Sequence, residues 1–110
     1  MNHINNKKEF VNYLNNNNLI ILDFFADWCG PCKQLTPILE ELAEINKEIC
    51  IVKINVDNED CNDICKLYQI TNLPTLIFIK EKICIDELKI IGLDKDLLLK
   101  NIEICKQKKK

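Results

Sequence analysis

The sequence predicts an α/β fold in which a central, mixed five-stranded sheet lies between four helices. Strand-like apolar segments alternate along the chain with amphipathic helical segments, which implies a mostly parallel sheet covered by helices. The last two strand-like segments follow one another without a helix between them, which adds an antiparallel hairpin at the end. The 110 residues leave room for one compact domain, and we expect residues 1–110 to form it.

The first part of the chain predicts a strand, a helix and a second strand. A brief strand is expected near His3 to Asn5, followed by an amphipathic stretch and the turn-forming run Asn15 to Asn18. The next segment, Leu19–Phe25, is apolar except for Asp23, which is typical of a strand buried on both faces. The apolar residues of the amphipathic stretch are Phe10, Val11 and Leu14.

A long helix is expected from Cys32 to about Glu48, because apolar residues recur there at intervals of three and four. Pro37 should kink or restart this helix, since proline lacks a backbone donor and clashes with the preceding turn. The segment Ile51–Asp57 alternates apolar and polar residues as a strand does.

The remaining elements are a short helix, a strand pair and a last helix. The short helix is expected from Asp60 to Tyr68. The segments Pro74–Ile79 and Ile83–Ile91 predict an antiparallel pair that ends at Gly92. The last helix is expected from Asp94, its N-cap, to Cys105. Four of the last five residues are lysines, which we interpret as a solvated end of that helix.

Composition excludes several classes of protein. Apolar residues make up 47% of the chain and charged residues 29%, which is typical of a globular protein. Residues 1–105 carry 11 lysines and 17 acidic residues, which argues against nucleic acid as a partner. The seven cysteines are too few for a disulfide scaffold and cannot all pair, which favours a reducing compartment. Without a signal-peptide core or an apolar run that could span a bilayer, we expect a cytoplasmic protein that does not act at a membrane.

A pair of cysteines separated by two residues lies between the buried strand and the long helix. Free N–H groups and the positive end of the dipole at a helix N-terminus favour a thiolate, which is the attacking species in disulfide exchange. We therefore expect Cys29 to be the exposed nucleophile and Cys32, one turn further in, to be the buried resolving cysteine. Gly30 removes side-chain bulk beside the reactive sulfur, and Pro31 fixes the first turn of the helix.

A zinc site is the alternative interpretation of such a pair, and it would need two further ligands. The candidates are Cys61, Cys65 and the single histidine, His3. The two cysteines lie on a predicted helix and lack the turn chemistry of a zinc ribbon, so we expect no metal.

The chain resembles the thioredoxin family nearly from end to end. Besides the cysteine pair, the resemblance rests on Pro37 in the following helix, Lys53 in the next strand and Gly92 after the last strand. The matching segments are Asp23-Phe24-Phe25-Ala26-Asp27-Trp28-Cys29-Gly30-Pro31-Cys32-Lys33 and Leu73-Pro74-Thr75. The resemblance implies the thioredoxin fold.

The resemblance also implies a substrate-binding loop around a proline. Pro74 would be cis and packed against the redox pair, the alternative being a trans proline that opens an edge strand. The backbone of Leu73 could then pair with an extended substrate peptide, and Thr75 follows it. Trp28, alternatively a plain core or surface aromatic, is expected in an apolar rim that receives partner proteins. The other members of that rim are Gly30, Pro31, Leu73 and Gly92.

Asp23 is a carboxylate in an apolar strand, so burial should raise its pKa toward that of a general base. The resemblance implies that it takes the proton of Cys32 through water. Lys53, on the adjacent strand, is its natural counter-ion. The alternative is an ordinary buried pair of structural value only.

By resemblance the chain is a general protein-disulfide reductase without a bound cofactor, to which NADPH contributes only through thioredoxin reductase. The implied clients are disulfide-containing proteins such as peroxiredoxin, methionine sulfoxide reductase and ribonucleotide reductase, and we expect a monomer. Two rivals stay open. One is a disulfide oxidase or isomerase, which Gly-Pro between the cysteines disfavours, and the other is a binding subunit in which redox turnover is incidental.

Two departures from the family pattern leave the groove rim and the final hairpin open. Gln69 and Asn72 stand where many relatives have glycine, and the hairpin Lys80–Asp86 has no glycine and looks longer than usual.

The other five cysteines carry no clear chemistry. Cys61 and Cys65 share a helical face with Ile64 and Tyr68, so we expect them to pack in the core, with a regulatory disulfide as the alternative. No role is assigned to Cys50, Cys84 and Cys105.

Overall fold

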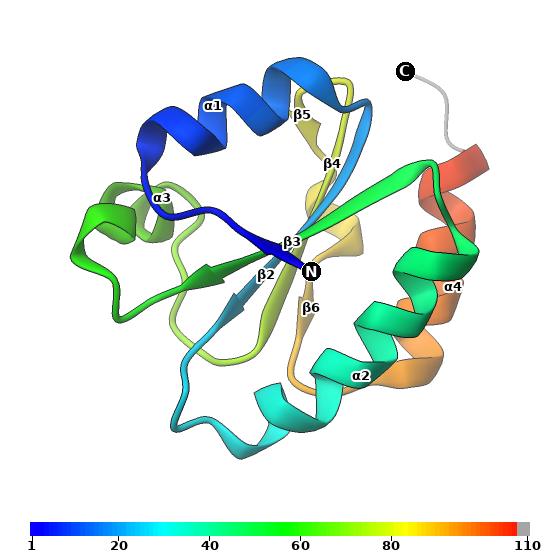
Figure 1. Ribbon diagram of the computed structural model, residues 1–110. Coiled ribbons are helices and arrows are strands. Elements are labelled where there is room, and N and C mark those ends of the chain that lie inside the picture. Colours follow the sequence, from blue (N-terminus) through cyan, green and yellow to red (C-terminus); the bar gives the residue numbers. More distant parts are fainter. Residues whose placement is uncertain (108–110) are drawn as a thin grey trace.

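The computed structural model describes residues 1–107 and shows a sheet packed between two pairs of helices (Figure 1). The strands are β1 (Asn2–His3), β2 (Leu19–Phe25), β3 (Ile49–Asn55), β4 (Thr75–Lys80), β5 (Ile83–Cys84) and β6 (Ile90–Ile91). The helices are α1 (Lys7–Asn16), α2 (Gly30–Ile45), α3 (Asn62–Leu67) and α4 (Lys95–Gln107), with short 3-10 helices η1 (Glu59–Cys61) and η2 (Asp86–Leu88). The predicted α/β fold, with a mixed sheet between four helices, is confirmed. The predicted lysine end of α4 lies largely outside the described residues.

The sheet is mixed because one strand runs against the others. The order is β1-β3-β2-β4-β5, and β6 also pairs with β4. Strands β1, β3 and β2 pair in parallel, whereas β4 pairs antiparallel with β2, β5 and β6. Strands β2 and β3 lie side by side over their whole length, from the pair Leu19 and Ile49 to the pair Phe25 and Asn55.

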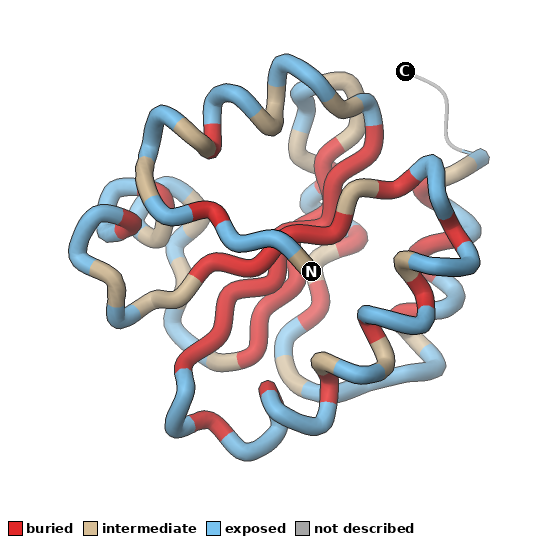
Figure 2. The backbone as a smooth tube through the Cα atoms, viewed as in Figure 1, coloured by how far each residue is buried: buried red, intermediate tan, exposed pale blue. Residues whose placement is uncertain are grey.

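Two apolar cores hold the helices on the sheet, and β2 contributes to both. Its residue Ile21 belongs to the same core as Leu39 of α2 and Ile102 of α4. Its neighbour Ile20 belongs to a second core with Phe10 of α1 and Ile64 of α3. Because side chains alternate between the faces of a strand, all seven residues of β2 are buried (Figure 2). The prediction of a strand buried on both faces is confirmed.

The boundaries of α2 differ from the expected ones for reasons of capping. Cys29 is the N-cap, so the helix begins at Gly30, two residues before the expected start. It ends at Ile45 because Asn46 donates both its backbone N–H and its side-chain amide to the carbonyl of Leu42, at 2.8 and 3.0 Å. The helix runs through Pro37 without a restart.

The single strand expected over Ile83–Ile91 is wrong. The segment pairs with β4 twice, as β5 and β6, and the turn η2 separates the two pairings. An extended strand would send Ile85 to one face of the sheet and Leu88 and Ile90 to the other. The turn places all three in the core that α2 and α4 cover. The sheet therefore has six strands instead of five.

The turn between β4 and β5 is tight, and it is built without glycine. Glu81 and Lys82 have φ angles of 51° and 70°, which is the left-handed pair that two-residue hairpins require. Lys80 pairs with Ile83 across the hairpin, which leaves Glu81 and Lys82 as a two-residue loop. The sequence alone did not decide this register.

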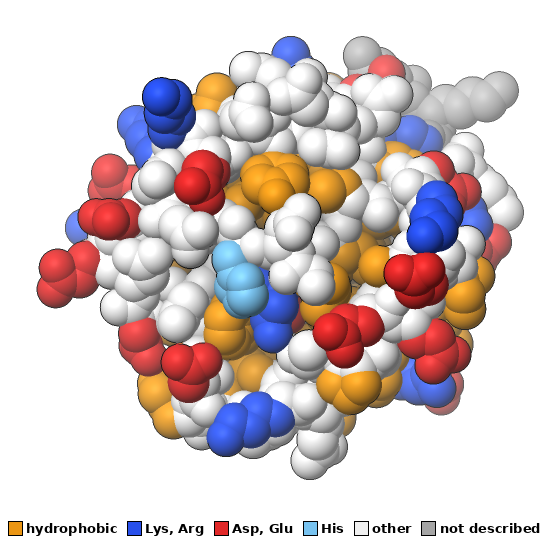
Figure 3. Space-filling view, viewed as in Figure 1, with side chains coloured by type: hydrophobic (Ala, Val, Ile, Leu, Met, Phe, Trp, Pro, Cys, Tyr) orange, Lys and Arg blue, Asp and Glu red, His pale blue; other side chains and the backbone are white. Residues whose placement is uncertain are grey.

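No helix within residues 1–107 is long and apolar enough to cross a bilayer. On the face of the molecule shown in Figure 3, acidic and basic side chains are interspersed.

Helix α3 ends in a conformation that usually belongs to glycine. The N–H of Gln69 donates to the carbonyl of Lys66 and that of Ile70 to the carbonyl of Cys65, both at 3.1 Å. These are the two bonds of a Schellman cap, whose left-handed residue is Gln69, with φ at 53°. The departure noted in the sequence is therefore a residue with a Cβ in a left-handed position.

We expect Gln69→Gly to raise the free energy of unfolding by roughly 0.5–1 kcal/mol. Glycine removes a left-handed penalty of about 1–2 kcal/mol, and its more flexible unfolded chain offsets part of that gain. Urea unfolding of the oxidised protein measures the change. The matched control is Gln69→Ala, which shortens the side chain but keeps the Cβ. Equal stability of the glycine and alanine variants would contradict the explanation.

Candidate functional site

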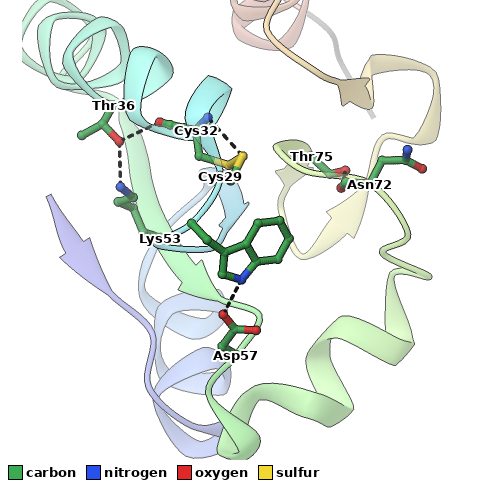
Figure 4. Close-up of a disulfide and its surroundings, with 8 residues drawn as sticks. Cys29, Cys32, Thr36, Lys53, Asp57, Asn72 and Thr75 are labelled. Carbon is green, nitrogen blue, oxygen red and sulfur yellow. Dashed lines mark hydrogen bonds between the residues drawn. A yellow bond between two sulfur atoms is a disulfide. The ribbon is translucent and has the colours of Figure 1, made fainter.

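The cysteine pair forms a disulfide at the point where the chain leaves β2 and enters α2. The Cα atoms of Cys29 and Cys32 are 5.3 Å apart, and Gly30 and Pro31 form the first turn of the helix between them. The Sγ of Cys29 accepts the backbone N–H of Cys32 at 3.2 Å (Figure 4). The same N–H group and the positive end of the helix will stabilise a thiolate on Cys29 once the disulfide is reduced.

The two sulfurs are almost equally buried, which corrects the expectation of an exposed Cys29. Cys29 is 5% exposed and Cys32 is 2% exposed, because both pack against Phe25 and Ala26. Their surroundings nevertheless differ. Cys29 lines an open groove of about 690 Å³, whereas Cys32 lines a separate hollow of about 300 Å³ beside Lys53. The two cysteines are therefore approached from different sides.

The groove beside Cys29 is bounded by the loop that joins α3 to β4. Of the five residues predicted for its rim, Trp28, Gly30, Pro31 and Leu73 line the groove, and Gly92 does not. Asn72, noted in the sequence as a departure at the rim, also lines it. Four further lining residues were not predicted, because nothing in the sequence marks them beyond their proximity to Pro74 or to the end of β3. They are Val56, Cys65, Ile70 and Thr71.

The peptide bond between Leu73 and Pro74 is cis, as predicted. Leu73 packs against the cluster that holds both cysteines, so this loop lies beside the disulfide. The hydroxyl of buried Thr75 donates to the carbonyl of Asn72 at 2.7 Å and closes the loop around the proline (Figure 4). Gly92 donates its N–H to the carbonyl of Pro74 at 2.8 Å. Four of the predicted rim and substrate residues, Leu73, Pro74, Thr75 and Gly92, therefore meet here.

Gly92 is required for its backbone conformation. Its φ is +92°, and a Cβ built on it would find no atom within 4 Å. A side chain would fit in space but would be strained in this conformation. The neighbours of Gly92, Ile91 and Leu93, are exposed apolar residues.

Trp28 is exposed and fixed in place. Its side chain is 71% exposed, and its indole N–H donates to Asp57 Oδ2 at 2.8 Å. Asp57 lies just beyond the end of β3, after Val56, and was not predicted as a site residue. An aromatic ring held by one hydrogen bond presents apolar surface to a partner at little entropic cost.

Asp23 has the environment that the sequence predicted. Its side chain is completely buried, and neither carboxylate oxygen has a hydrogen-bond partner. Burial raises its pKa to about 6, and the positive charge of Lys53 only partly opposes that rise. A carboxyl with this pKa can exchange a proton near neutral pH.

Lys53 lies beside Asp23 but does not form the expected ion pair. The two residues are direct neighbours across β2 and β3, yet the ion pairs of the described chain do not include them. The ammonium group of Lys53 instead donates to Thr36 Oγ1 at 2.8 Å and lies 4.2 Å from the centre of the Phe25 ring. The sequence analysis missed Thr36, because it enters the site only through the packing of α2 on β3.

The remaining five cysteines are free thiols. Cys61 is completely buried, and its Sγ lies 3.4 Å from the carbonyl oxygen of Ile4. Cys65 is half-buried, packs against the same core and reaches the edge of the groove. Burial raises the pKa of both thiols. This agrees with packing, and no disulfide joins the two residues here.

The described residues 1–107 contain no group of three His, Cys, Asp or Glu side chains placed to hold a metal ion. What they do contain is a disulfide at a helix N-terminus beside a cis-proline loop, and a buried carboxyl in the strand that leads to that helix. This combination defines a thiol–disulfide oxidoreductase, in which one sulfur is stabilised as a thiolate and a second lies close enough to displace it.

Comparison with known proteins identifies the family. The family model described as Thioredoxin matches residues 2–103. A thioredoxin of Mycoplasmoides gallisepticum is 44% identical over 81 residues, which are 74% of this chain and 79% of that protein. A thioredoxin of Chlamydia caviae is 41% identical over 85 residues, which are 76% and 79% of the two chains.

Solved structures agree. Oxidised mitochondrial thioredoxin 3 of Saccharomyces cerevisiae superimposes with a TM-score of 0.85 at 35% identity, covering 94% of this chain and 93% of that one. Plasmodium falciparum thioredoxin gives a TM-score of 0.85 at 30% identity, with coverages of 94% and 97%. The chain belongs to the thioredoxin family. It is a protein-disulfide oxidoreductase that acts on disulfide-containing proteins.

We expect alkylation of the reduced protein at neutral pH to modify Cys29 much faster than Cys32. Of the pair, only Cys29 lines the groove and has its sulfur at the helix N-terminus, whereas Cys32 lines the separate hollow. Peptide mapping by mass spectrometry after a brief exposure to iodoacetamide measures both rates. Burial raises the pKa of Cys50, Cys61 and Cys65, so these thiols provide slow internal references. Faster modification of Cys32 would reverse the assigned roles.

We expect Asp23→Asn to stabilise the protein, and to do so more at neutral than at acidic pH. The folded pKa of about 6 lies above the unfolded value of 3.8, so folding favours the protonated carboxyl. The cost of burying the charge is absent below about pH 4, grows as the pH rises through 6, and then levels off at about 3 kcal/mol. Urea unfolding of both proteins over this range measures the difference. A difference that does not change with pH would show that the pKa of Asp23 is unshifted.

Proposed function

We propose that the chain is a general protein-disulfide reductase that works in the cytoplasm as a monomer and is recycled by an NADPH-dependent thioredoxin reductase. The observation that carries the roles of the two cysteines is the placement of their side chains. Cys29 opens on a groove that can hold a polypeptide, whereas Cys32 lines a separate hollow beside Lys53. The groove therefore offers a client disulfide the sulfur of Cys29 and leaves Cys32 for the second exchange.

The reaction consists of two exchanges. The thiolate of Cys29 attacks one sulfur of the client disulfide, forms a mixed disulfide and releases the other client sulfur as a thiolate. Cys32 then loses its proton and attacks the sulfur of Cys29. The second client thiolate leaves, and the intramolecular disulfide described above forms. Two electrons pass from the protein to the client, and thioredoxin reductase returns them from NADPH.

Residues around the disulfide take distinct roles in these steps. Asp23 accepts the proton of Cys32 through water, and its pKa of about 6 supports this role. Lys53 tunes Asp23 through its charge. The exposed ring of Trp28 and the apolar residues beside Gly92 receive the client, and the backbone of Leu73 pairs with an extended segment of it. Thr75 and Pro74 hold that backbone in position.

Peroxiredoxin, methionine sulfoxide reductase and ribonucleotide reductase are the client classes that we propose. For peroxiredoxin there is support from a relative: a yeast structure with a TM-score of 0.84 and 34% identity is described in terms of thiol resolution of a mitochondrial 1-Cys peroxiredoxin through the glutathione and thioredoxin systems. The mechanism uses no resident cofactor. The Gly-Pro sequence between the cysteines supports a reductase over an oxidase or isomerase.

The test is turnover of a protein disulfide, for example that of insulin, with NADPH and thioredoxin reductase. We expect NADPH consumption to depend on the chain and to be lost in Cys29→Ser. Cys32→Ser should instead trap the client as a mixed disulfide, because the second exchange cannot occur. If turnover is absent and Cys29→Ser still binds clients, the chain is a binding subunit. If it rearranges scrambled disulfides faster than it reduces them, the chain is an isomerase.

A further inference from the structure

Thr36 joins Lys53 to the backbone of Cys32. It lies one turn after Cys32 on α2, and its hydroxyl donates to the carbonyl of Cys32 at 3.1 Å. The same oxygen accepts a hydrogen bond from the ammonium group of Lys53 at 2.8 Å (Figure 4). The directions are fixed, because an ammonium group can only donate and the hydroxyl has a single hydrogen.

Lys53 has two possible acceptors and uses only one of them. Its neighbour across the sheet, Asp23, offers two buried oxygens that have no partner. A buried ammonium group requires an acceptor, and attraction to a buried carboxylate is stronger than attraction to a neutral hydroxyl. Lys53 nevertheless donates to Thr36 and contacts the face of the Phe25 ring.

We propose that Thr36 is a positioning residue: its hydroxyl holds the ammonium group of Lys53 beside the start of α2 and keeps it from pairing with Asp23. This inference rests on the proposed function, in which Asp23 serves as the base for Cys32. A carboxylate paired with an ammonium group would be a weaker base. By holding the lysine, Thr36 keeps Asp23 able to accept a proton near neutral pH.

Few other titratable groups face this region. His3 of β1 pairs with Lys53, its ring lies 5.6 Å from that of Phe25, and the charge of Lys53 helps to lower its pKa. Asp27, in the loop before α2, and Lys33, on α2 itself, line the hollow together with Cys32. Among these groups Lys53 is the one whose charge acts on Asp23. Burial raises the pKa of the carboxyl, and the position of the lysine therefore decides how much of that rise its charge offsets.

The experiment removes the hydroxyl of Thr36 without changing the volume of the side chain. In Thr36→Val the ammonium group loses its acceptor, and we expect it to turn to its cross-strand neighbour Asp23, whose two buried oxygens have no partner. Titration of the Asp23 carboxyl carbon by NMR in the oxidised protein then gives the pKa directly, so the titration of His3 cannot be mistaken for it. We expect the pKa of Asp23 to fall by about one unit or more, since an opposite charge within ~4–6 Å lowers a carboxyl pKa by about 1–3 units.

Three variants serve as controls. Thr36→Ser keeps the hydroxyl and should titrate like the wild type. Thr36→Ala repeats the deletion in case the valine variant does not fold. In a Lys53→Met background, the further change Thr36→Val should leave the pKa of Asp23 unchanged, because the ammonium group that would otherwise move is absent. In single-turnover reduction of a client disulfide by protein that keeps Cys32, the acidic limb of the pH profile for the second exchange should move to lower pH in Thr36→Val and return in Thr36→Ser.

Equal titration of Asp23 in the wild type and in both deletion variants would overturn the positioning role, as would a rise of its pKa. So would a fall of the same size in the Lys53→Met background. These outcomes are separate from failure of the proposed function. A wild-type protein that turns over no disulfide would reject the reductase, while the titration would still decide where Thr36 holds the lysine.

Discussion

The burial of β2 on both faces is the constraint on which the rest of the molecule depends. Helices cover the strand from both sides, so every one of its seven residues is withdrawn from water. Six of them gain from this, and Asp23 alone is penalised. The same strand delivers the chain to the N-terminus of α2, where the disulfide forms. One buried strand thus provides the apolar frame, the perturbed carboxyl and the position of the two sulfurs.

The two sulfurs of the disulfide adjoin different surroundings. The groove that Cys29 lines is bordered by the exposed Trp28 and by the cis-proline loop. The hollow that Cys32 lines also contains Lys53 and Thr36, the threonine that links the lysine to α2. In the proposed reaction the groove receives the client, and the charge of Lys53 acts on the proton affinity of its cross-strand neighbour Asp23.

Much of the fold could be predicted from local pattern. The apolar run of β2 and the recurrence of apolar residues along α2 reflect their burial. Asp94 could be predicted as a helix cap, and its side chain accepts the N–H of Leu97. The break between β5 and β6 could not be predicted in this way. It depends on which side of the sheet Ile85 and Leu88 must reach, and that is decided by the packing of α2 and α4. The cis bond at Pro74 came from the resemblance to a family, since local preference alone favours trans.

The site also combines features that the local sequence predicts with features that depend on the packing of distant elements. The cysteine pair and Asp23 were visible in the sequence because each is unusual for its position. The neighbour relation of Asp23 and Lys53 was also correct, but the direction of a flexible lysine depends on which acceptors surround it. Thr36 supplies that acceptor from another element, and nothing in its own sequence context marks it. Strand register can be predicted from pattern, whereas the rotamer of a long side chain requires the assembled core.

The hydrogen bond between Trp28 and Asp57 has a practical consequence. Trp28 is the only tryptophan of the chain, it adjoins the disulfide, and its ring is held by a carboxylate at 2.8 Å. The ultraviolet emission of the protein therefore comes almost entirely from one fluorophore at the reacting bond. The molecule contains an optical reporter of its own oxidation state, and exchange with a client can be followed in real time without any label.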